Sequence, residues 1–442
     1  MKISVIGCGY LGAVHAACMA SLGHEVIGID VDASRVAALN AGRPPFYEPG
    51  FPEVLGEALA TGRLRFAMNT DPGVIADADV HFIAVGTPQS SDGEAADVSY
   101  VDAAVDFIME AIKHSTRDRS TPPVVVGKST VPVGTAARLQ TRLDAVGALL
   151  VWNPEFLREG HAVADTLCPD RIVYGLPDKG GEVARRVLDE VYAEALSAGI
   201  PQVLTDFATA ELVKVAANSF LATKISFINA MAQLCEATGG DVTQLAEAIG
   251  HDKRIGKHFL GAGIGFGGGC LPKDIRAFAA RAGQLDIAEV VDLLHTVDAI
   301  NHQAMRRVVA ACERELGDVH STHIGILGGA FKANSDDIRE SPALLIASEL
   351  AARGARVSIY DPQAGSNIAA KYPALNVVDS LDEAVTGADM TLVLTEWKEF
   401  RELSPADIAK HGARRRILDG RNILDPAEWK DAGWSYTGMG RA

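Results

Sequence analysis

The sequence has 442 residues, more than a single hydrophobic core usually serves, so we expect two or three domains. Hydrophobic residues make up 48% of the chain and charged residues 22%, a balance that is typical of globular proteins and excludes a disordered one. The formal net charge of −16 argues against a nucleic-acid-binding protein, because contact with the phosphate backbone requires a basic surface.

The start of the chain and its cysteines indicate a compartment. Residues 1–7, MKISVIG, lead directly into a strand and its turn, which leaves no room for a signal peptide, and the apolar runs are too short to span a membrane. The six cysteines are scattered, with no C-x-x-C pair that would indicate a metal site or a disulfide framework. We therefore expect a cytoplasmic protein with no membrane, nucleic-acid or metal partner.

In the first half of the chain, short apolar runs alternate with helical stretches. The runs expected to form buried strands are residues 3–6, 25–29, 80–85, 124–128 and 149–152. Strands that alternate with helices predict a parallel, doubly wound sheet of the α/β class.

The pattern changes near residue 207. Residues 207–238 form one long Ala-rich stretch without Pro or Gly, which predicts a helix, and residues 286–316 are also helix-rich. Strand, helix and strand signals return at 323–327, 341–353 and 356–360. We predict two Rossmann-like, doubly wound domains, 1–203 and 318–442, joined by a helical segment, 204–317.

The clearest motif is the G-x-G-x-x-G run at residues 7–12, which follows a strand and opens a helix. Gly7 makes the turn, Gly9 lets the backbone approach a pyrophosphate, and Gly12 lets helix and strand pack closely. Asp30 ends the next strand and would bind the adenosine ribose hydroxyls, with Arg35 one helical turn beyond. The motif predicts an NAD site, because a carboxylate at this position repels the 2′-phosphate of NADP.

Two further strand ends carry hydroxyl side chains. Thr87 follows the run at 80–85, and Thr130 follows the run at 124–128. Ligands bind at the carboxyl ends of strands in open α/β sheets, although turns of this kind are common in any protein.

The glycine-rich segment 261–274, GAGIGFGGGCLPKD, predicts a reactive thiol. Six of the nine residues before Cys270 are Gly, which is costly in backbone entropy unless something approaches closely. Pro272 suits the first turn of a helix that runs to about residue 283, so Cys270 would lie at a helix N-terminus with Lys273 nearby. Both effects favour a thiolate, whereas an inert buried thiol is the better interpretation of the other five cysteines.

A dehydrogenase with a cysteine nucleophile has a definite reaction type: an aldehyde adds the thiolate, the adduct is oxidised to a thioester, and water releases a carboxylate. Such a route needs carboxylates to handle protons and donors to stabilise an oxyanion. Glu155 and Glu159 follow a strand end, and they are either this pair or a solvated surface pair. Lys214 and Asn218 lie one turn apart on the long predicted helix, where they form an oxyanion-binding pair unless Lys214 extends to solvent.

At this point the sequence resembles a known family. The strings VIGCGYLG, FYEPG, VGTP, KSTVPVGT, NPEFLREG, ELVKVAANSFLA, RIGKHFLGAGIGFGGGCLPKD, AFKANSDDIRESPAL and YDP are similar, in their order, to those of the UDP-glucose/GDP-mannose dehydrogenases. The resemblance implies an NAD domain, a helical dimerisation domain and a C-terminal sugar-nucleotide domain, arranged in a homodimer or a dimer-based oligomer. It also implies oxidation of UDP-glucose by two NAD and water to UDP-glucuronate.

The resemblance assigns roles by position. It implies that Cys270 is the nucleophile, that Lys214 and Asn218 stabilise the oxyanion, and that water and protons are arranged by Thr130, Glu155, Glu159 and Asp274. The residues implied to face NAD are Gly7, Gly9, Tyr10, Leu11, Gly12, Asp30, Arg35, Thr87, Thr130, Glu159, Lys273 and Arg339. Those implied to face the sugar nucleotide are Glu155, Phe156, Leu157, Lys214, Asn218, Arg254 (from the partner subunit), Phe259, Gly267, Lys332 and Arg421.

One departure and several alternatives stay open. Gly269 replaces the Ser that usually precedes the cysteine, so no role can depend on that hydroxyl. The same chemistry on GDP-mannose or a UDP-N-acetylhexosamine is the nearest alternative. A hydroxyacid or 6-phosphogluconate-type dehydrogenase has no use for Cys270, and an NAD-binding sensor would not need Cys270, Lys214, Asn218 and Glu155 together.

Overall fold

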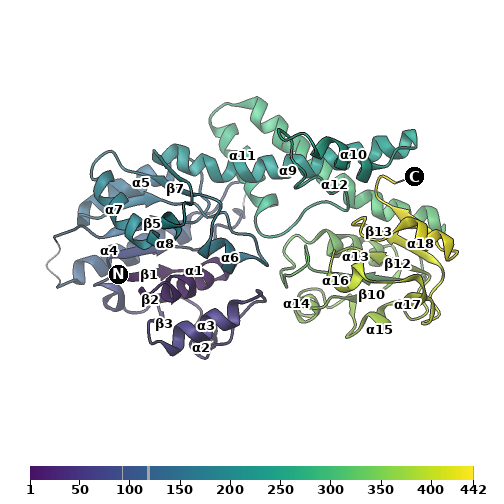
Figure 1. Cartoon of the computed structure of the whole chain (residues 1–442), viewed down its shortest axis with the longest axis horizontal. Coiled ribbons are helices and arrows are strands. Elements are labelled where there is room, and N and C mark those ends of the chain that lie inside the picture. The colour runs from purple at the N-terminus through teal and green to yellow at the C-terminus, as the bar shows by residue number, and fades with distance from the viewer. Residues whose placement is uncertain (92, 117–119, 442) are drawn as a thin grey trace. The chain divides into compact units, whose positions relative to one another are not determined.

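The computed structural model describes residues 1–91, 93–116 and 120–441 of the chain (Figure 1). The chain divides into two compact units, Met1–Ala217 and Asn218–Ala442, which we call the N-terminal and the C-terminal unit. The division falls inside helix α9 (Phe207–Thr238), which is continuous over 32 residues, as the sequence predicted. Each unit is built on one sheet.

The sheet of the N-terminal unit has eight strands in the order β3-β2-β1-β4-β5-β6-β7-β8. All neighbouring strands pair in parallel except β6 and β7. The first six strands have the order of a dinucleotide-binding fold. Their bounds are β1 Lys2–Ile6, β2 Glu25–Asp30, β3 Leu64–Met68, β4 Val80–Ile83, β5 Val124–Gly127, β6 Leu149–Trp152, β7 Ile172–Gly175 and β8 Gln202–Thr205.

Helices cover both faces of this sheet, because its strands carry apolar side chains on both faces. The helices are α1 Tyr10–Ser21, α2 Ala33–Asn40, α3 Phe51–Ala60, α4 Ser99–His114, α5 Thr135–Leu143, α6 Ala162–Leu167, α7 Gly181–Val191 and α8 Ala193–Ser197, with 3-10 turns at Pro72–Ile75 and Asp144–Val146. Along β4, Val80 and Phe82 belong to one core and Ile83 to the other.

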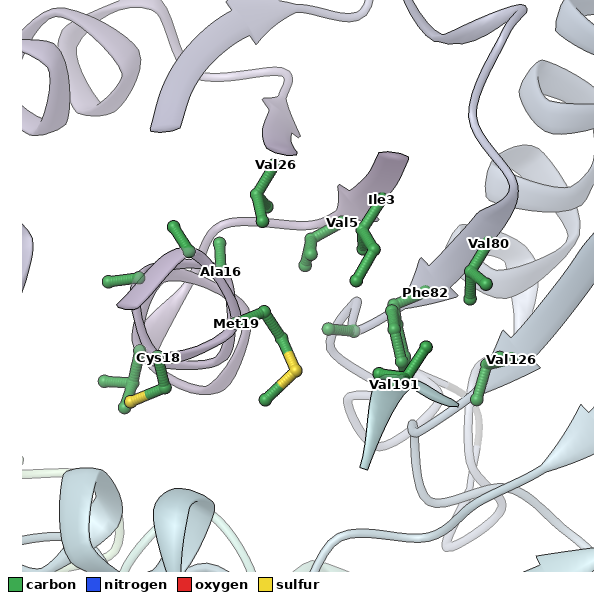
Figure 2. Packing of buried hydrophobic residues seen from close by; sticks show 14 of the residues in the cluster. Ile3, Val5, Ala16, Cys18, Met19, Val26, Val80, Phe82, Val126 and Val191 are labelled. Carbon is green, nitrogen blue, oxygen red and sulfur yellow. The ribbon is translucent and has the colours of Figure 1, made fainter. Parts of the chain in front are cut away.

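The first of these cores lies under α1. Figure 2 shows Ala16 and Met19 on the side of α1 that faces Ile3, Val5 and Val26 of β1 and β2. All five side chains are less than 5% exposed. Close packing of α1 on the sheet fixes the glycine turn that joins β1 to α1. This turn is the first part of the candidate site.

The sheet of the C-terminal unit repeats the topology of the first six strands of the N-terminal sheet. Its order is β11-β10-β9-β12-β13-β14, all parallel. The strands are β9 His323–Leu327, β10 Arg356–Tyr360, β11 Asn376–Val377, β12 Met390–Val393, β13 Arg416–Asp419 and β14 Ser435–Gly438. The helices are α10 Val242–Gly250, α11 Leu271–Gln284, α12 Ala288–Leu316, α13 Pro342–Ala352, α14 Gly365–Lys371, α15 Leu381–Val385, α16 Lys398–Arg401, α17 Pro405–Ala409 and α18 Pro426–Asp431.

The predicted fold class, two Rossmann-like sheets joined by long helices, is therefore confirmed. Strands β3, β7, β8 and β11–β14 were not predicted. In β8 the apolar side chains of Val203 and Leu204 are each 42% exposed, so this strand lacks the pattern of a buried one. Within the described ranges, the helices lack the combination of length and apolar character that crossing a bilayer needs.

Candidate active site

The turn after β1 has the geometry that a dinucleotide needs. Gly7 has φ +91°, and a Cβ there would lie 2.8 Å from Val85. A Cβ at Gly12 would lie 1.8 Å from the carbonyl oxygen of Gly7, so helix and turn pack as expected. A Cβ at Gly9 would meet no protein atom within 4 Å, so the space in front of Gly9 is open.

A cavity of about 350 Å³ opens in front of this turn, at the carboxyl ends of β1 and β4, where the strand order reverses. Ligands bind at such a switch point in open α/β sheets. Its walls are mostly apolar, as an adenosine requires, and include Tyr100, Ala103, Ala104 and Phe107 of α4. The sequence reasoning did not single out these four residues, because an amphipathic helix face looks the same whether it packs on a core or lines a cavity.

Asp30 is 5% exposed and lies on the wall of the same cavity. Its carboxylate accepts the N–H of Cys8 at 2.8 Å and forms an ion pair with Arg35 at 3.0 Å. The carboxylate thus fixes the glycine turn while the cavity leaves it facing the ligand space. This arrangement fits NAD.

The side chains of Tyr10 and Leu11 contact the protein itself. The Tyr10 hydroxyl donates to the carboxylate of Glu48 and accepts the N–H of Gly160 at 2.9 Å. The side chain of Leu11 packs against the core under α1. What these two residues present to a pyrophosphate is therefore the N-terminus of α1 rather than their side chains.

The segment that carries Glu155 and Glu159 is irregular, so the two carboxylates are not a like-charged pair on a helix face. Instead, Glu155 pairs with Lys214 of α9 at 3.0 Å, and both side chains are nearly buried. The ring centre of Phe156 lies 3.7 Å from the Arg171 guanidinium carbon and 5.7 Å from Lys214 Nζ. The predicted base and the predicted oxyanion donor are therefore in direct contact.

Two buried glutamates hold the loops of this site. Glu48 accepts the N–H groups of Gly160 and Ala162, at 2.6 and 2.7 Å, at the start of α6. Glu211 accepts those of Gly134 and Ala136, at 2.7 and 2.6 Å, at the start of α5. The first pair follows Glu159 and the second follows the loop of Thr130, whose carbonyl accepts the Thr87 hydroxyl at 2.8 Å. Both glutamates lie in strings that resemble the family, FYEPG and ELVKVAANSFLA, but no local pattern predicted their contacts, since the N–H groups that each one accepts lie at least 75 residues away.

Lys128 is a third buried charge that the sequence reasoning missed. Its ammonium lies between the ends of β5 and β6, where it donates to Asn153 Oδ1 at 3.0 Å and to the Tyr192 hydroxyl at 3.3 Å. Burial lowers the pKa of Lys128 to about 8, partly offset by Glu155, and Lys214 lowers it further. A lysine that ends an apolar run, directly before Ser129-Thr130, was the available signal.

In the C-terminal unit, Cys270 is the N-cap residue of α11, with Pro272 in the first turn, as predicted. Its thiol is exposed at the positive end of a 14-residue helix. Asp274, which is 2% exposed, accepts from Asn218 Nδ2 at 2.7 Å and pairs with Lys273 at 2.6 Å. Lys273 is thus paired with a carboxylate, and the N-terminus of α11 is a feature of the structure that favours a thiolate at Cys270.

The departure at Gly269 has a structural reason. A Cβ at this position would lie 2.2 Å from the guanidinium carbon of Arg339, which pairs with Asp337 at 2.6 Å. Glycine here accommodates the Arg339 side chain. A serine would force that flexible side chain to move.

Besides Asn218 and Gly267, where a Cβ would lie 2.1 Å from the carbonyl oxygen of Glu340, the predicted sugar-nucleotide residues of the C-terminal unit form two groups. Lys332 and Arg421 follow β9 and β13, at the carboxyl edge of the sheet. Arg421 donates to three backbone carbonyls of the same unit, and the Lys332 ammonium lies 5.4 Å from the Phe331 ring centre. Arg254 and Phe259 instead lie in an exposed segment, where Arg254 pairs with Asp252.

The structure therefore gathers the predicted residues into clusters within each unit. In the N-terminal unit these are the glycine turn with Asp30, and Glu155 with Lys214. In the C-terminal unit, Asn218 of α9 and Lys273 of α11 both contact Asp274, which lies in the first turn of the helix that Cys270 caps. Lys214 and Asn218 stand one turn apart on α9, so one helix carries a member of each cluster.

Comparison with known proteins agrees with this geometry. Three models of the UDP-glucose/GDP-mannose dehydrogenase family match the chain: the NAD binding domain over residues 1–196, the central domain over 208–303 and the UDP binding domain over 325–426. The chain belongs to this family.

Within this family, the chain is similar over its full length to several UDP-glucose dehydrogenases. The chain is 41% identical over 449 residues to the UDP-glucose 6-dehydrogenase of Rhizobium meliloti, with all of both chains covered. It is 40% identical over 447 residues to the UDP-glucose 6-dehydrogenase YwqF of Bacillus subtilis, covering 100% of this chain and 98% of the relative. A solved UDP-glucose dehydrogenase from Pyrobaculum islandicum is 39% identical with a TM-score of 0.90, covering 100% and 98%.

Proposed function

We propose that this protein is an NAD-dependent UDP-glucose 6-dehydrogenase, which converts UDP-glucose, two NAD and water into UDP-glucuronate and two NADH. The observation that carries the proposal is the thiol of Cys270 at the N-terminus of α11, in a protein whose other unit has a dinucleotide cavity. A dehydrogenase that stops at an aldehyde needs no thiol. The activity named for relatives at about 40% identity over the full length supports the same reaction.

The reaction balances around Cys270. The primary alcohol of the glucose is oxidised to an aldehyde, and the thiolate sulfur adds to the aldehyde carbon to give a thiohemiacetal. Oxidation of this adduct gives a thioester, and water then displaces the sulfur, so the carbon leaves as a carboxylate and the thiol is regenerated. When bound, NAD accepts a hydride in each of the two oxidations.

The residues around these steps have matching chemistry. Lys214 and Asn218 donate to the oxyanion that forms when the sulfur adds, and α9 holds them on adjacent turns. Glu155, already paired with Lys214, takes up a proton. Asp274 and Thr130 orient water. The carboxylate of Asp274 is itself held by hydrogen bonds that Asn218 and Lys273 donate.

The residues that we propose to hold the cofactor are the glycine turn, Asp30, Arg35, Thr87, Thr130, Glu159, Lys273 and Arg339. Support for NAD over NADP comes from Asp30, whose buried carboxylate leaves no favourable environment for a 2′-phosphate. The sugar nucleotide is held by Phe156, Leu157, Phe259, Gly267, Lys332 and Arg421. Lys332 and Arg421 offer charge-assisted hydrogen bonds to its diphosphate.

The proposed assembly is a homodimer formed through α9. Phe220, Phe227 and Leu234 are 67%, 48% and 57% exposed, and they recur every seven residues along this helix. An exposed apolar stripe with heptad spacing is a surface that a second, identical helix covers. Arg254, exposed on the loop after α10, would serve the neighbouring site.

The proposal also covers the cellular location and the domain boundaries. We infer a cytoplasmic location from the six scattered cysteines, whose spacing does not suggest a disulfide framework. We also keep the functional boundaries 1–203, 204–317 and 318–442 for the NAD-binding, dimerisation and sugar-nucleotide domains. Limited proteolysis that cuts near residues 203 and 317 would support these boundaries.

The first experiment measures NADH formation from a panel of sugar nucleotides: UDP-glucose, GDP-mannose, UDP-N-acetylglucosamine and UDP-N-acetylmannosamine. We expect UDP-glucose to have the highest kcat/KM and to yield two NADH per molecule. A higher kcat/KM with another member would replace the substrate while keeping the chemistry.

The second experiment tests the nucleophile. Cys270→Ala should lose uronate formation while it still folds and binds NAD, because an exposed thiol contributes little to a core. The expectation of a buried thiol was wrong for Cys168, which is exposed, whereas Cys8, Cys18, Cys235 and Cys312 are buried. Cys168→Ala is therefore the matched control and should keep wild-type activity. Uronate formation by Cys270→Ala near the wild-type rate would remove the covalent mechanism.

A further inference from the structure

The loop before Cys270 is bonded at its centre to two buried asparagines. The N–H of Phe266 donates to Asn301 Oδ1 at 2.8 Å, and Asn301 Nδ2 donates back to the Phe266 carbonyl at 2.9 Å. Asn229 Oδ1 accepts the N–H of Gly263 at 2.8 Å. Asn301 lies on α12 and Asn229 on α9, so the loop is attached to both long helices of the C-terminal unit.

Further backbone contacts attach the loop to the end of β13. The Arg421 guanidinium donates to the carbonyl of Gly265 at 3.0 Å, and the N–H of Ile264 donates to the carbonyl of Gly420 at 3.0 Å. Successive peptide groups of the loop thus bond to three different elements. A loop bonded in this way has one conformation rather than an ensemble.

The glycines of the loop are required by these contacts. A Cβ at Gly263 would lie 2.6 Å from the carbonyl oxygen of Gly420, and a Cβ at Gly265 would lie 2.5 Å from Asn301 Oδ1. Gly265 also has φ +100°, a conformation that other residues rarely adopt. What approaches these two glycines is therefore the protein itself.

Asn301 is well suited to hold such a loop. It is 2% exposed. Its side-chain amide accepts from the N–H of Phe266 and donates to the carbonyl of the same residue, as a neighbouring strand would. A buried amide is tolerated when both ends are bonded, and it then enforces one geometry. An apolar residue of the same size would leave the N–H and the carbonyl of Phe266 buried without these bonds.

We propose that Asn301 is a positioning residue for Cys270. It fixes Phe266, four residues before the thiol, so that the sulfur is already aimed when the aldehyde forms. This inference rests on the proposed function. Addition forms the sulfur–carbon bond as the carbonyl electron pair moves to oxygen, and it must happen before the aldehyde leaves the site. Effective molarity, and not thiol reactivity alone, sets that competition.

The test measures how completely the second oxidation follows the first. Wild-type enzyme should give two NADH per sugar nucleotide and no aldehyde that semicarbazide can trap. Asn301→Leu should slow the second oxidation on the order of 100-fold, because a misplacement of about 1 Å has an effect of that size. NADH per sugar nucleotide then falls toward one, and trapped aldehyde appears. Gln303→Leu, exposed two residues along the same helix, is the control and should stay fully coupled.

A residue that only stabilised the fold would lower the amount of active enzyme and leave the ratio at two. Thermal unfolding followed by circular dichroism reports on the folding of the whole chain, including the C-terminal unit to which Asn301 belongs, independently of activity. If Asn301→Leu is not folded, the ratio is read from Asn301→Asp, which keeps the acceptor for Phe266 and loses the donor. Two NADH per sugar nucleotide and no trapped aldehyde in the folded variants would overturn the inference. A wild-type ratio of one would instead overturn the proposed function.

Discussion

At the scale of single residues, this protein relies on buried polar groups that each hold a backbone or a strand end. Glu48 and Glu211 each accept two N–H groups at the start of a helix, and Asn301 bonds both polar groups of one peptide. Lys128 joins the ends of β5 and β6. Such groups are kept because removing one partner leaves the other buried and unbonded.

Lys128 makes stability depend on pH in a definite direction. Its pKa is lowered by burial to about 8, from 10.5 in an unfolded chain, so between these values the unfolded state binds more protons. Relative to Lys128→Met, the free energy of unfolding of the wild type should therefore rise as the pH increases from about 8 to about 10.5, by up to about 1.4 kcal/mol per pH unit. Below pH 8 the difference should be constant.

Urea unfolding at several pH values measures this difference. Lys113→Met is the control, because Lys113 is exposed and pairs only with Glu110 on its own helix among the ion pairs described. Its curve should run parallel to that of the wild type. A parallel curve for Lys128→Met as well would show that Lys128 keeps an ordinary pKa despite its burial.

At the scale of elements, helix α9 carries two different groups of residues on separate faces. One face carries Lys214 and Asn218, which are 5% and 7% exposed. Another carries the apolar stripe of Phe220, Phe227 and Leu234. A 32-residue helix of this kind is stabilised by packing rather than by propensity alone, so an exposed apolar stripe calls for a partner.

The dimer is tested by placing charge on this stripe. Phe220→Asp and Phe227→Asp should dissociate the dimer, because two carboxylates per pair of helices would be buried in an apolar contact. Light scattering after size exclusion measures the molar mass. Leu345→Asp on α13, a position 41% exposed, is the matched control and should leave the mass unchanged. A wild-type protein that is an active monomer would rule out the assembly.

At the scale of the whole molecule, the same strand order occurs in both sheets, but the residues at the point where the order reverses differ. The N-terminal sheet places a glycine turn and Asp30 at an open cavity. In the C-terminal sheet, the corresponding Asp361 accepts the N–H groups of Gly329 and Ala330 and lies within 3.3 Å of Trp397 Nε1. Asp361 is thus bonded within its own unit, as Asp30 is, and differs from it in accepting the Trp397 indole N–H in place of an arginine ion pair.

This division predicts separable binding. Lys332→Ala should weaken the binding of UDP about tenfold, because it removes one charge-assisted contact, and should leave the Kd of NAD unchanged. Arg421→Ala should also lower kcat, because Arg421 bonds the loop of Cys270 as well. Calorimetry with UDP and with NAD separately measures the two affinities. An effect of Lys332→Ala confined to NAD would assign that residue to the wrong nucleotide.

The sequence alone determined the fold class, the NAD motif and the position of the thiol, because each has a local signature. Periodic apolar runs predict strands and helices, G-x-G-x-x-G specifies a turn, and a glycine-rich run before Cys-Leu-Pro predicts a helix start. These signals involve residues within a few positions of one another, so local physics suffices to interpret them.

Only the tertiary structure decided what supports the chemistry. Glu48 lies 112 residues from Gly160, and Asn301 lies 35 from Phe266, so neither pair leaves a periodic pattern in the sequence. The loop glycines looked like space for a ligand, whereas at Gly263 and Gly265 the protein itself fills that space. Contacts between distant segments form only when the chain folds, because the loss of conformational entropy is compensated by burial of the whole core. That is why the position of Cys270 at a helix start was predictable and the residues bonded to its loop were not.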